Sequence, residues 1–174
     1  MLKKFKPTWM VKSIYDISPS QLKKHNIKNI LTDLDNTLIA WNDKNSTNRL
    51  KSWLDYMSKN EINVVVVSNN QKRRVQKALE GLDVSYIYRS MKPTSYGINK
   101  AIKEFSFDKK ESVMIGDQLL TDILGSNISH VKSILVKPLV PSDAWVTKGN
   151  RIIEKFILNQ LAKKDKNFYW KEDI

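Results

Sequence analysis

Apolar and polar positions alternate along the chain in blocks that predict strands and helices in turn. Short, mainly apolar runs rich in β-branched or aromatic residues predict five strands, at residues 27–34, 63–67, 84–88, 112–115 and 131–136. Apolar residues at helical spacing predict helices at residues 46–59, 71–82, 98–105, 119–124 and 151–161. The alternation predicts an α/β fold, a Rossmann-like, doubly wound, mainly parallel five-stranded sheet flanked by helices.

Both ends of the chain fall outside this alternation. Residues 1–17 mix lysines with aromatic and aliphatic residues, and we interpret them as a basic and aromatic N-terminal arm. Ser18 followed by Pro19 predicts the start of a short helix, so we expect the domain to span residues 18–162. Residues 163–174 are expected to form a charged C-terminal tail.

Composition narrows the class of protein. A chain of 174 residues with 41% hydrophobic content can bury one sizeable core. It contains no cysteine, which excludes disulfides and thiolate metal sites and agrees with a reducing cytoplasm. The formal net charge of +12 favours polyanionic surroundings, such as nucleic acid, an anionic membrane or a phosphorylated substrate. Charge that serves only solubility explains the same number equally well.

Polar residues collect where the predicted strands end. Asp33 and Asp35 end the first strand, and Ser68 and Asn69 follow the second. Lys92 lies beyond the third strand, and the pair Gly116-Asp117 ends the fourth. Ligands of doubly wound sheets bind outside the carboxyl ends of the strands. We therefore interpret these residues as one active site.

The residue types indicate phosphoryl transfer. Asp33, Asp35, Asp117 and Asp122 form an all-oxygen set with no histidine or cysteine nearby, which suits a hard cation such as Mg²⁺. A carboxylate can also act as a nucleophile, and a second one can exchange protons with the leaving group and water. Lys92 and Ser68 suit phosphate oxygens. The glycine-rich loops of nucleotide-binding proteins are absent from the sequence.

Each of these residues has a structural alternative. The Asp-x-Asp segment and Asp117 could be ordinary turn residues, and Thr37 and Asn69 could be caps of the segments that follow them. Asp122 and Lys92 could be solvated surface residues.

Four segments resemble, in order, the motifs of the haloacid dehalogenase (HAD) superfamily of phosphatases. They are Asp33-Leu34-Asp35-Asn36-Thr37, Ser68-Asn69, Lys92-Pro93 and Gly116-Asp117-Gln118-Leu119-Leu120-Thr121-Asp122. The resemblance implies a HAD-like core, with Asp33 as nucleophile and Asp35 as general acid/base. It further implies Mg²⁺ ligation by Asp33, Asp117, Asp122 and the main chain of Asp35. Thr37, Ser68, Asn69 and Lys92 would bind or position the substrate phosphate.

The spacing of the motifs leaves no room for a cap domain, and an open site accepts large or surface-bound substrates. The N-terminal arm, Trp41 and the Gly-Asp-Gln-Leu-Leu-Thr-Asp segment are similar to the YqeG-type phosphatases, which are related to phosphatidylglycerophosphate phosphatases. This similarity implies hydrolysis of phosphatidylglycerophosphate in phospholipid biosynthesis. The alternatives are a HAD phosphatase of nucleotides or nucleic-acid ends, using the basic segment from Lys72 to Lys77 and the basic C-terminal helix, or a non-enzymatic polyanion-binding protein.

The N-terminal arm is a candidate for membrane contact. Its lysines interleave with Phe5, Trp9, Met10, Ile14 and Tyr15, a composition that suits an anionic bilayer surface. We therefore expect a cytoplasmic protein with peripheral contact to the inner face of the membrane. The alternative is an arm that packs back onto the domain.

Overall fold

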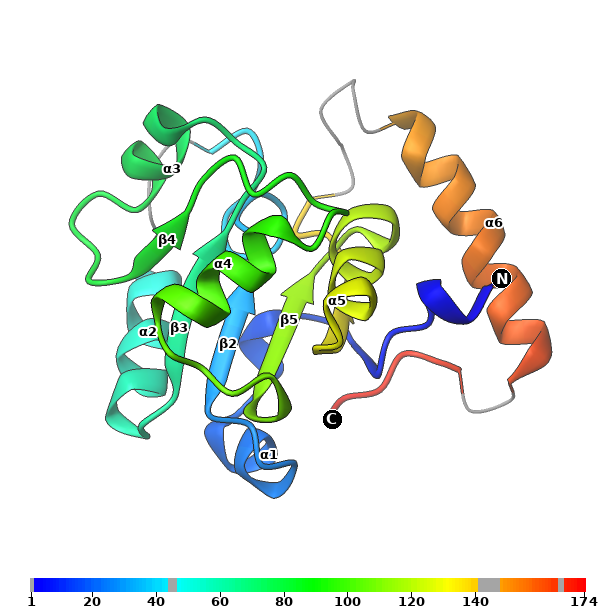
Figure 1. Cartoon of the computed structure of the whole chain (residues 1–174), viewed down its shortest axis with the longest axis horizontal. Coiled ribbons are helices and arrows are strands. Elements are labelled where there is room, and N and C mark those ends of the chain that lie inside the picture. The colour runs from blue at the N-terminus through cyan, green and yellow to red at the C-terminus, as the bar shows by residue number, and fades with distance from the viewer. Residues whose placement is uncertain (1, 44–46, 141–147, 166–167) are drawn as a thin grey trace.

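The computed structural model describes residues 2–43, 47–140, 148–165 and 168–174. Within these residues the centre of the molecule is a sheet of six strands in the order β1-β6-β5-β2-β3-β4, with every neighbouring pair parallel (Figure 1). The strands are β1 (Trp9–Val11), β2 (Asn29–Thr32), β3 (Asn63–Val67), β4 (Ser85–Ile87), β5 (Ser112–Gly116) and β6 (Lys132–Val136). The predicted α/β class and parallel sheet are confirmed.

The predicted number of strands is wrong by one, because the N-terminal arm supplies β1. Trp9 pairs with Ile134 and Val11 with Val136, and the Thr8 N–H donates to the Ser133 carbonyl oxygen at 3.0 Å. With three residues between lysine-rich flanks, this strand is too short to give a periodic signal.

The apolar residues of the arm are largely used inside the domain. Met10, Val11 and Ile14 have relative exposures of 6%, 0% and 0%. Phe5 and Trp9 are only partly exposed and pack against the core clusters. Of the two interpretations of the arm, packing onto the domain is the one that the structure displays.

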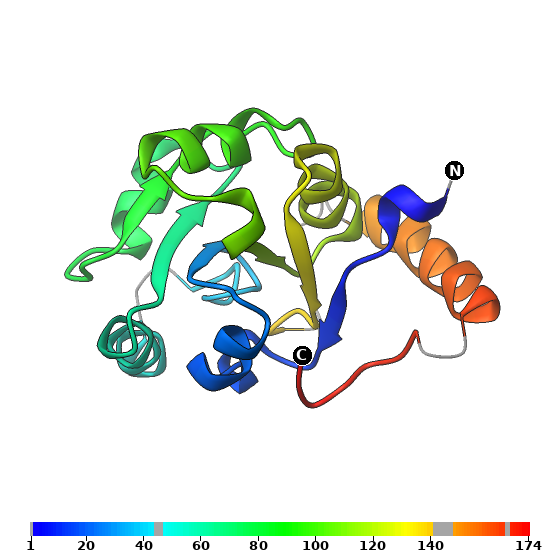
Figure 2. The same ribbon diagram turned by 60° about the horizontal axis from the view of Figure 1, so that its bottom comes forward.

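Helices cover both faces of the sheet, as Figure 2 shows. One face carries α1 (Pro19–Lys24), α2 (Asn48–Lys59) and α3 (Lys72–Ala78), and the other carries α4 (Tyr96–Glu104), α5 (Leu124–Ser129) and α6 (Lys148–Lys164). Successive strand residues point to opposite faces. Ile30 and Val66 accordingly join the first core, and Leu31 and Val65 join the second.

Shorter helical turns complete the fold. They are η1 (Leu2–Phe5), η2 (Ile14–Asp16), η3 (Lys109–Glu111) and the π-helical turn η4 (Leu119–Ile123), which runs directly into α5. Among the described residues, no helix combines the length and the apolar character that crossing a bilayer requires.

The C-terminal segment also returns to the domain. The Lys171 N–H donates to the Met10 carbonyl oxygen at 2.9 Å, and Lys171 forms a bridge with Val11 beside the edge strand. Phe168 and Trp170 pack against the core under α6, whereas Tyr169 is exposed. The end of the chain therefore covers the edge of the sheet that β1 would otherwise expose.

Candidate active site

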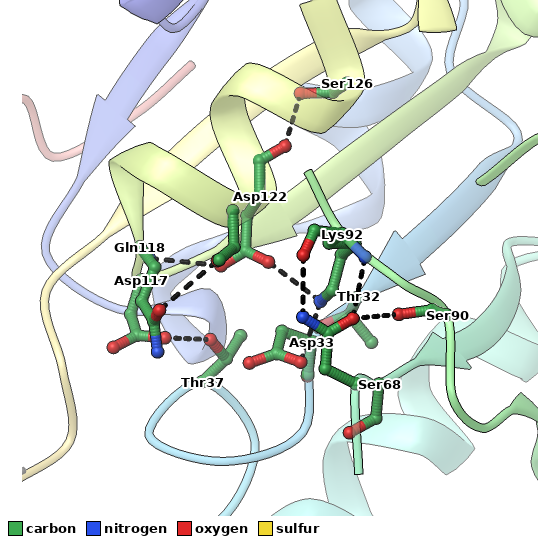
Figure 3. A network of polar contacts seen from close by, with 12 residues as sticks. Thr32, Asp33, Thr37, Ser68, Ser90, Lys92, Asp117, Gln118, Asp122 and Ser126 are labelled. Carbon is green, nitrogen blue, oxygen red and sulfur yellow. Dashed lines mark hydrogen bonds and ion pairs between the residues drawn. The ribbon is translucent and has the colours of Figure 1, made fainter. Parts of the chain in front are cut away.

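The candidate site lies at the carboxyl ends of the central strands, where the sequence places it. Asp33 directly follows β2, and its N–H donates to the Ile115 carbonyl oxygen at 2.9 Å, which extends the ladder by one residue. Asp117 directly follows β5, and Lys92 lies in the loop after β4. Figure 3 shows these side chains converging on one point.

Three carboxylates form the centre of the site. Asp33, Asp117 and Asp122 each place an oxygen within 4.8 Å of the others. Asp122 comes from η4, and the Gln118 N–H donates to its Oδ2 at 3.0 Å. A Cβ at Gly116 would lie 2.2 Å from that oxygen, so only glycine leaves room for this carboxylate. The surface alternative for Asp122 is wrong, since its side chain is 0% exposed.

Lys92 joins two of these carboxylates. Its Nζ lies 2.8 Å from Asp33 Oδ1 and 2.8 Å from Asp122 Oδ1, and its side chain is 2% exposed. Burial alone lowers the pKa of Lys92, but the carboxylates of Asp122 and Asp33 outweigh burial and hold that pKa above its usual value. Lys92 is therefore a buried, permanently charged ammonium, and the alternative of an ordinary surface lysine is wrong.

Asn69 positions the main chain of Lys92. Its side-chain amide donates to the Lys92 carbonyl oxygen at 2.9 Å, and its Oδ1 accepts from the Lys92 N–H at 2.7 Å and from the Ser90 hydroxyl at 2.7 Å. The N-cap of α3 is Gln71 rather than Asn69. The capping alternative is wrong, and direct contact of Asn69 with phosphate stays a prediction.

Asp117 is held by two elements far apart in the sequence. The Thr37 hydroxyl donates to Asp117 Oδ1 at 3.2 Å. From α6, the Arg151 guanidinium donates to Asp117 Oδ2 and, at 2.7 Å, to the Asp117 carbonyl oxygen. Glu154 in turn accepts from Arg151 at 3.1 Å and from the Leu120 N–H at 2.9 Å. The sequence analysis missed Arg151 and Glu154.

The side chain of Asp35 contacts Arg74 of α3 and Asn70 just before that helix. Arg74 donates to Asp35 Oδ1 at 2.5 Å, and the Asn70 side chain donates to Oδ2. Burial raises the pKa of Asp35, Arg74 opposes that rise through a hydrogen bond and its charge, and the nearby charge of Asp33 adds to it. A carboxyl group with a raised pKa can carry a proton closer to neutral pH than an ordinary aspartate.

Ser68 lies at the end of β3 on the same edge of the sheet. Its side chain is buried, and its hydroxyl accepts from the Asn70 N–H at 3.2 Å. Its main chain joins β4 and the loop after it, because its N–H donates to Ile87 and its carbonyl accepts from Ser90, both at 2.9 Å. Ser68 is thus positioned beside the loop that carries Lys92, and its phosphate contact stays a prediction.

The carboxylate centre fits a divalent cation. Its three carboxylates are paired with only two cationic side chains among the described residues, Lys92 and Arg151. When all three are ionised, the cluster therefore carries an excess of negative charge. Asp122 Oδ1 is buried and forms its ion pair with Lys92, and among the described residues it accepts no further hydrogen bond. An all-oxygen set of this kind suits Mg²⁺.

Without a cation the same cluster is an unfavourable arrangement of charge. The pKa of Asp117 is raised to about 8, mainly by burial and further by the carboxylates of Asp122 and Asp33, while Arg151 opposes the rise. Burial also raises the pKa of Asp122, against the opposing charge of Lys92. Folded protein free of metal therefore takes up protons here that the unfolded chain releases.

We expect the metal-free protein to lose stability as the pH rises from about 6 to about 8, because Asp117 must ionise in the folded state while it is already ionised in the unfolded chain. Mg²⁺ binds the ionised carboxylates, so its stabilising effect is expected to grow over the same range. Thermal unfolding in EDTA and in Mg²⁺ at several pH values measures both.

Asp117→Asn is the control, since it removes the titrating group and is expected to flatten the pH dependence in EDTA. An unfolding temperature in EDTA that increases over this range would contradict the assignment of the raised pKa to this cluster.

Comparison with known proteins finds relatives of the chain among hydrolases. A model of the haloacid dehalogenase-like hydrolase family matches residues 2–136. The protein named "Probable phosphatase YqeG" from Bacillus subtilis (strain 168) is 44% identical over 173 residues, which are 99% of this chain and 100% of that protein.

Solved structures share the fold at low sequence identity. An uncharacterized protein from Listeria monocytogenes serotype 4b superimposes with a TM-score of 0.52 and 14% identity, over 68% of this chain and 85% of that one. The cobalt-bound deoxy-D-mannose-octulosonate 8-phosphate phosphatase from Haemophilus influenzae gives a TM-score of 0.49 and 18% identity, over 81% of this chain and 92% of that one. The first of these likenesses supports the architecture of the core.

Proposed function

The chain belongs to the haloacid dehalogenase-like hydrolases and is a phosphatase of that family, and we propose that it hydrolyses phosphatidylglycerophosphate through a phosphorylated Asp33. The observation that carries the chemistry is the contact of Lys92 with both Asp33 and Asp122 inside a cluster of three carboxylates. Family membership removes the alternative of a non-enzymatic polyanion-binding protein.

Asp33 is the nucleophile in this proposal. Its side chain is 13% exposed, whereas those of Asp117 and Asp122 are 0% exposed, so Asp33 is the member of the cluster that an incoming phosphate reaches. A carboxylate oxygen of Asp33 attacks phosphorus and forms an oxygen–phosphorus bond, and the bond from phosphorus to the ester oxygen of the substrate breaks.

Asp35 handles the protons. As a carboxylic acid it gives its proton to the departing alkoxide, which leaves as the alcohol, and Asp35 becomes a carboxylate. It then takes a proton from water as that water attacks phosphorus, the bond to Asp33 breaks, and inorganic phosphate leaves with the Asp33 carboxylate restored. The hydrogen bonds from Arg74 and Asn70 keep Asp35 in place for both transfers.

Lys92 supplies positive charge beside the attacking carboxylate. Because Lys92 Nζ already bridges Asp33 and Asp122, it is placed to form an ion pair with the phosphoryl group. The same ammonium shields the Asp33 carboxylate from the negative charge of that group. Three polar residues support this arrangement. Thr37 does so through its hydrogen bond to Asp117, Asn69 through its hydrogen bond to the main chain of Lys92, and Ser68 through its main-chain contact with the loop that carries Lys92.

Asp33, Asp117, Asp122 and the main-chain carbonyl of Asp35 would hold Mg²⁺. When bound, Mg²⁺ neutralises charge on the transferring phosphoryl group. Arg151 and Glu154 hold Asp117 from α6, so the C-terminal helix contributes to the orientation of one proposed ligand.

The choice of a lipid phosphate is supported by the openness of the site. Between Asp35 and Ser68 the described residues contain α2 and β3, and between Ser68 and Lys92 they contain α3 and β4. None of these elements forms a cap, so the site is compatible with a substrate that is itself part of a surface. The YqeG relative supports phosphatase activity, and its name does not specify the molecule that bears the phosphate.

A second candidate is a nucleotide or nucleic-acid end. It is favoured by the start of α3, where Lys72 Nζ lies 5.9 Å from the centroid of the Tyr88 ring and Arg74 contacts Asp35. A cation beside an exposed aromatic ring is a surface on which a base can stack.

A substrate panel distinguishes the two candidates. Phosphatidylglycerophosphate in detergent micelles, nucleoside monophosphates and 3′-phosphorylated oligonucleotides are compared for phosphate release with Mg²⁺. We expect phosphatidylglycerophosphate to give the highest kcat/KM, by about tenfold or more. A tenfold preference requires roughly 1.4 kcal/mol of extra binding in the transition state. A higher kcat/KM for a nucleotide or an oligonucleotide would overturn the lipid assignment while keeping the phosphatase chemistry.

A further inference from the structure

The helix α6 connects the carboxylate cluster to an uncovered apolar surface. Arg151, near its start, donates to the Asp117 carbonyl oxygen at 2.7 Å, so this end of α6 lies at the active site. Figure 1 shows the start of α6 at the end of the molecule toward which the strands of the sheet point. The residues that follow Arg151 therefore lie on a helix whose start contacts the carboxylate cluster.

Two sides of α6 are apolar, and the domain covers only one of them. Ile157 and Leu161 are buried against the core formed with Met10 and Leu135. On the outer side, Ile152, Ile153 and Phe156 are 74%, 51% and 62% exposed. Phe156 lies four residues after Ile152 and three after Ile153, the two spacings at which side chains are neighbours on a helix surface, so the three form a single apolar patch. Exposed patches of large apolar side chains mark interaction surfaces.

The charge around this patch is positive. Lys155, Lys163 and Lys164 are exposed on the same helix. Glu154 is the only acidic residue among residues 148–164, and it is buried and paired with Arg151. An exposed apolar face flanked by lysines is complementary to an anionic bilayer, in which lysines meet phosphate headgroups and apolar side chains enter the boundary with the acyl chains.

A second copy of this chain is a poorer occupant of the same patch. A two-fold contact would set the lysines of one helix against those of the other, and like charges across an interface are unfavourable. Three side chains are also a small part of the roughly 800 Å² per partner that a stable protein interface buries.

The N-terminal arm does not offer a comparable surface, because Met10, Val11 and Ile14 are buried in the domain. In the loop between β4 and α4, Met91 is 60% exposed and directly precedes Lys92. Exposed apolar side chains thus lie next in sequence to residues of the site in two different segments of the chain.

We propose that the patch of Ile152, Ile153 and Phe156, with the flanking lysines of α6, docks the enzyme on an anionic membrane and so presents the carboxylate cluster to phosphate groups at the lipid surface. The docking surface follows from α6 itself. Only its purpose, delivery of a lipid phosphate, rests on the proposed function.

Vesicle flotation of the full chain tests the docking surface. The wild-type protein is expected to float with phosphatidylcholine vesicles that contain phosphatidylglycerol, and to remain unbound with phosphatidylcholine alone. The triple variant Ile152→Ser/Ile153→Ser/Phe156→Ser is expected to lose binding to the anionic vesicles by about tenfold or more, since burial of several apolar groups is removed. Tyr56→Ser, which changes a 49% exposed residue on α2, is the matched control and is expected to bind as the wild type does.

Hydrolysis of p-nitrophenyl phosphate by the triple variant is expected to equal that of the wild type, because the three residues lie outside the catalytic groups. Equal flotation of the wild type and the triple variant, or no flotation of the wild type, would overturn the proposal. A wild-type dimer that the triple variant converts to a monomer, with no binding to vesicles, would overturn it in favour of a second copy.

Failure of docking is distinguishable from failure of the substrate assignment. Phosphatidylglycerophosphate in detergent micelles tests the substrate without a membrane, whereas flotation on vesicles that lack it tests docking without turnover.

Discussion

Asp33→Asn is expected to lower kcat/KM for p-nitrophenyl phosphate by about 10³-fold or more, because the amide cannot form the proposed bond to phosphorus. The side chain keeps nearly the same shape, and the Asp33 N–H still continues the ladder to Ile115. We therefore expect the variant to fold. Phosphate release with Mg²⁺ measures activity, and thermal unfolding measures the fold.

Asp55→Asn is the matched control, since Asp55 is an exposed aspartate on α2. It should leave kcat/KM within about twofold of the wild-type value, as surface substitutions away from a site change little. Substantial turnover by Asp33→Asn, in a folded sample free of wild-type enzyme, would show that another group attacks phosphorus.

Lys92→Met is expected to damage both stability and catalysis. It removes the ammonium that lies 2.8 Å from both Asp33 and Asp122 and leaves their carboxylates buried without that partner. Breaking a buried ion pair in this way costs about 3–5 kcal/mol in the free energy of unfolding. Mg²⁺ is expected to recover part of the stability, since it returns positive charge to the cluster, but not the activity.

Chemical denaturation with and without Mg²⁺ measures the stability of this variant. The control is Lys100→Met, which changes an exposed lysine on α4 and is expected to have little effect. Full activity in Lys92→Met would contradict the proposed role of the ammonium, and unchanged stability would contradict the burial of its ion pairs.

The location of the site could be predicted from the sequence because parallel strands all end at the same edge of their sheet. Asp33, Lys92 and Asp117 each follow a strand, so the strand pattern alone brings them to one edge. The structure adds the contacts that make the location chemically meaningful. The burial of Asp122 and the ion pair of Lys92 remove the alternatives of surface residues.

The contacts of Asp117 with α6 could not be predicted in the same way. Arg151 lies 34 residues beyond Asp117, on a helix whose position depends on packing rather than on a sheet ladder. The one available signal was Glu154, an acidic residue amid the apolar positions of a helix that is otherwise basic, since a buried acid needs a partner.

The sequence did not predict strand β1, for a different reason. Residues 9–11 are too few to establish a period of two, and they pair with β6 through contacts more than 120 residues away in the sequence. The basic residues around them indicated a surface arm, although long lysine side chains can remain in water while their neighbours are buried.

The central claim, a phosphorylated Asp33, is tested most directly with Asp35→Asn. This variant lacks the group that activates water, so the second step is slowed, while p-nitrophenolate is a good enough leaving group to depart without a proton. Rapid mixing of this variant with p-nitrophenyl phosphate and Mg²⁺, followed by acid quenching and peptide mass spectrometry, measures the intermediate. We predict a phosphoryl group on Asp33. A phosphoryl group on another residue, or none while p-nitrophenolate is released, would contradict the account.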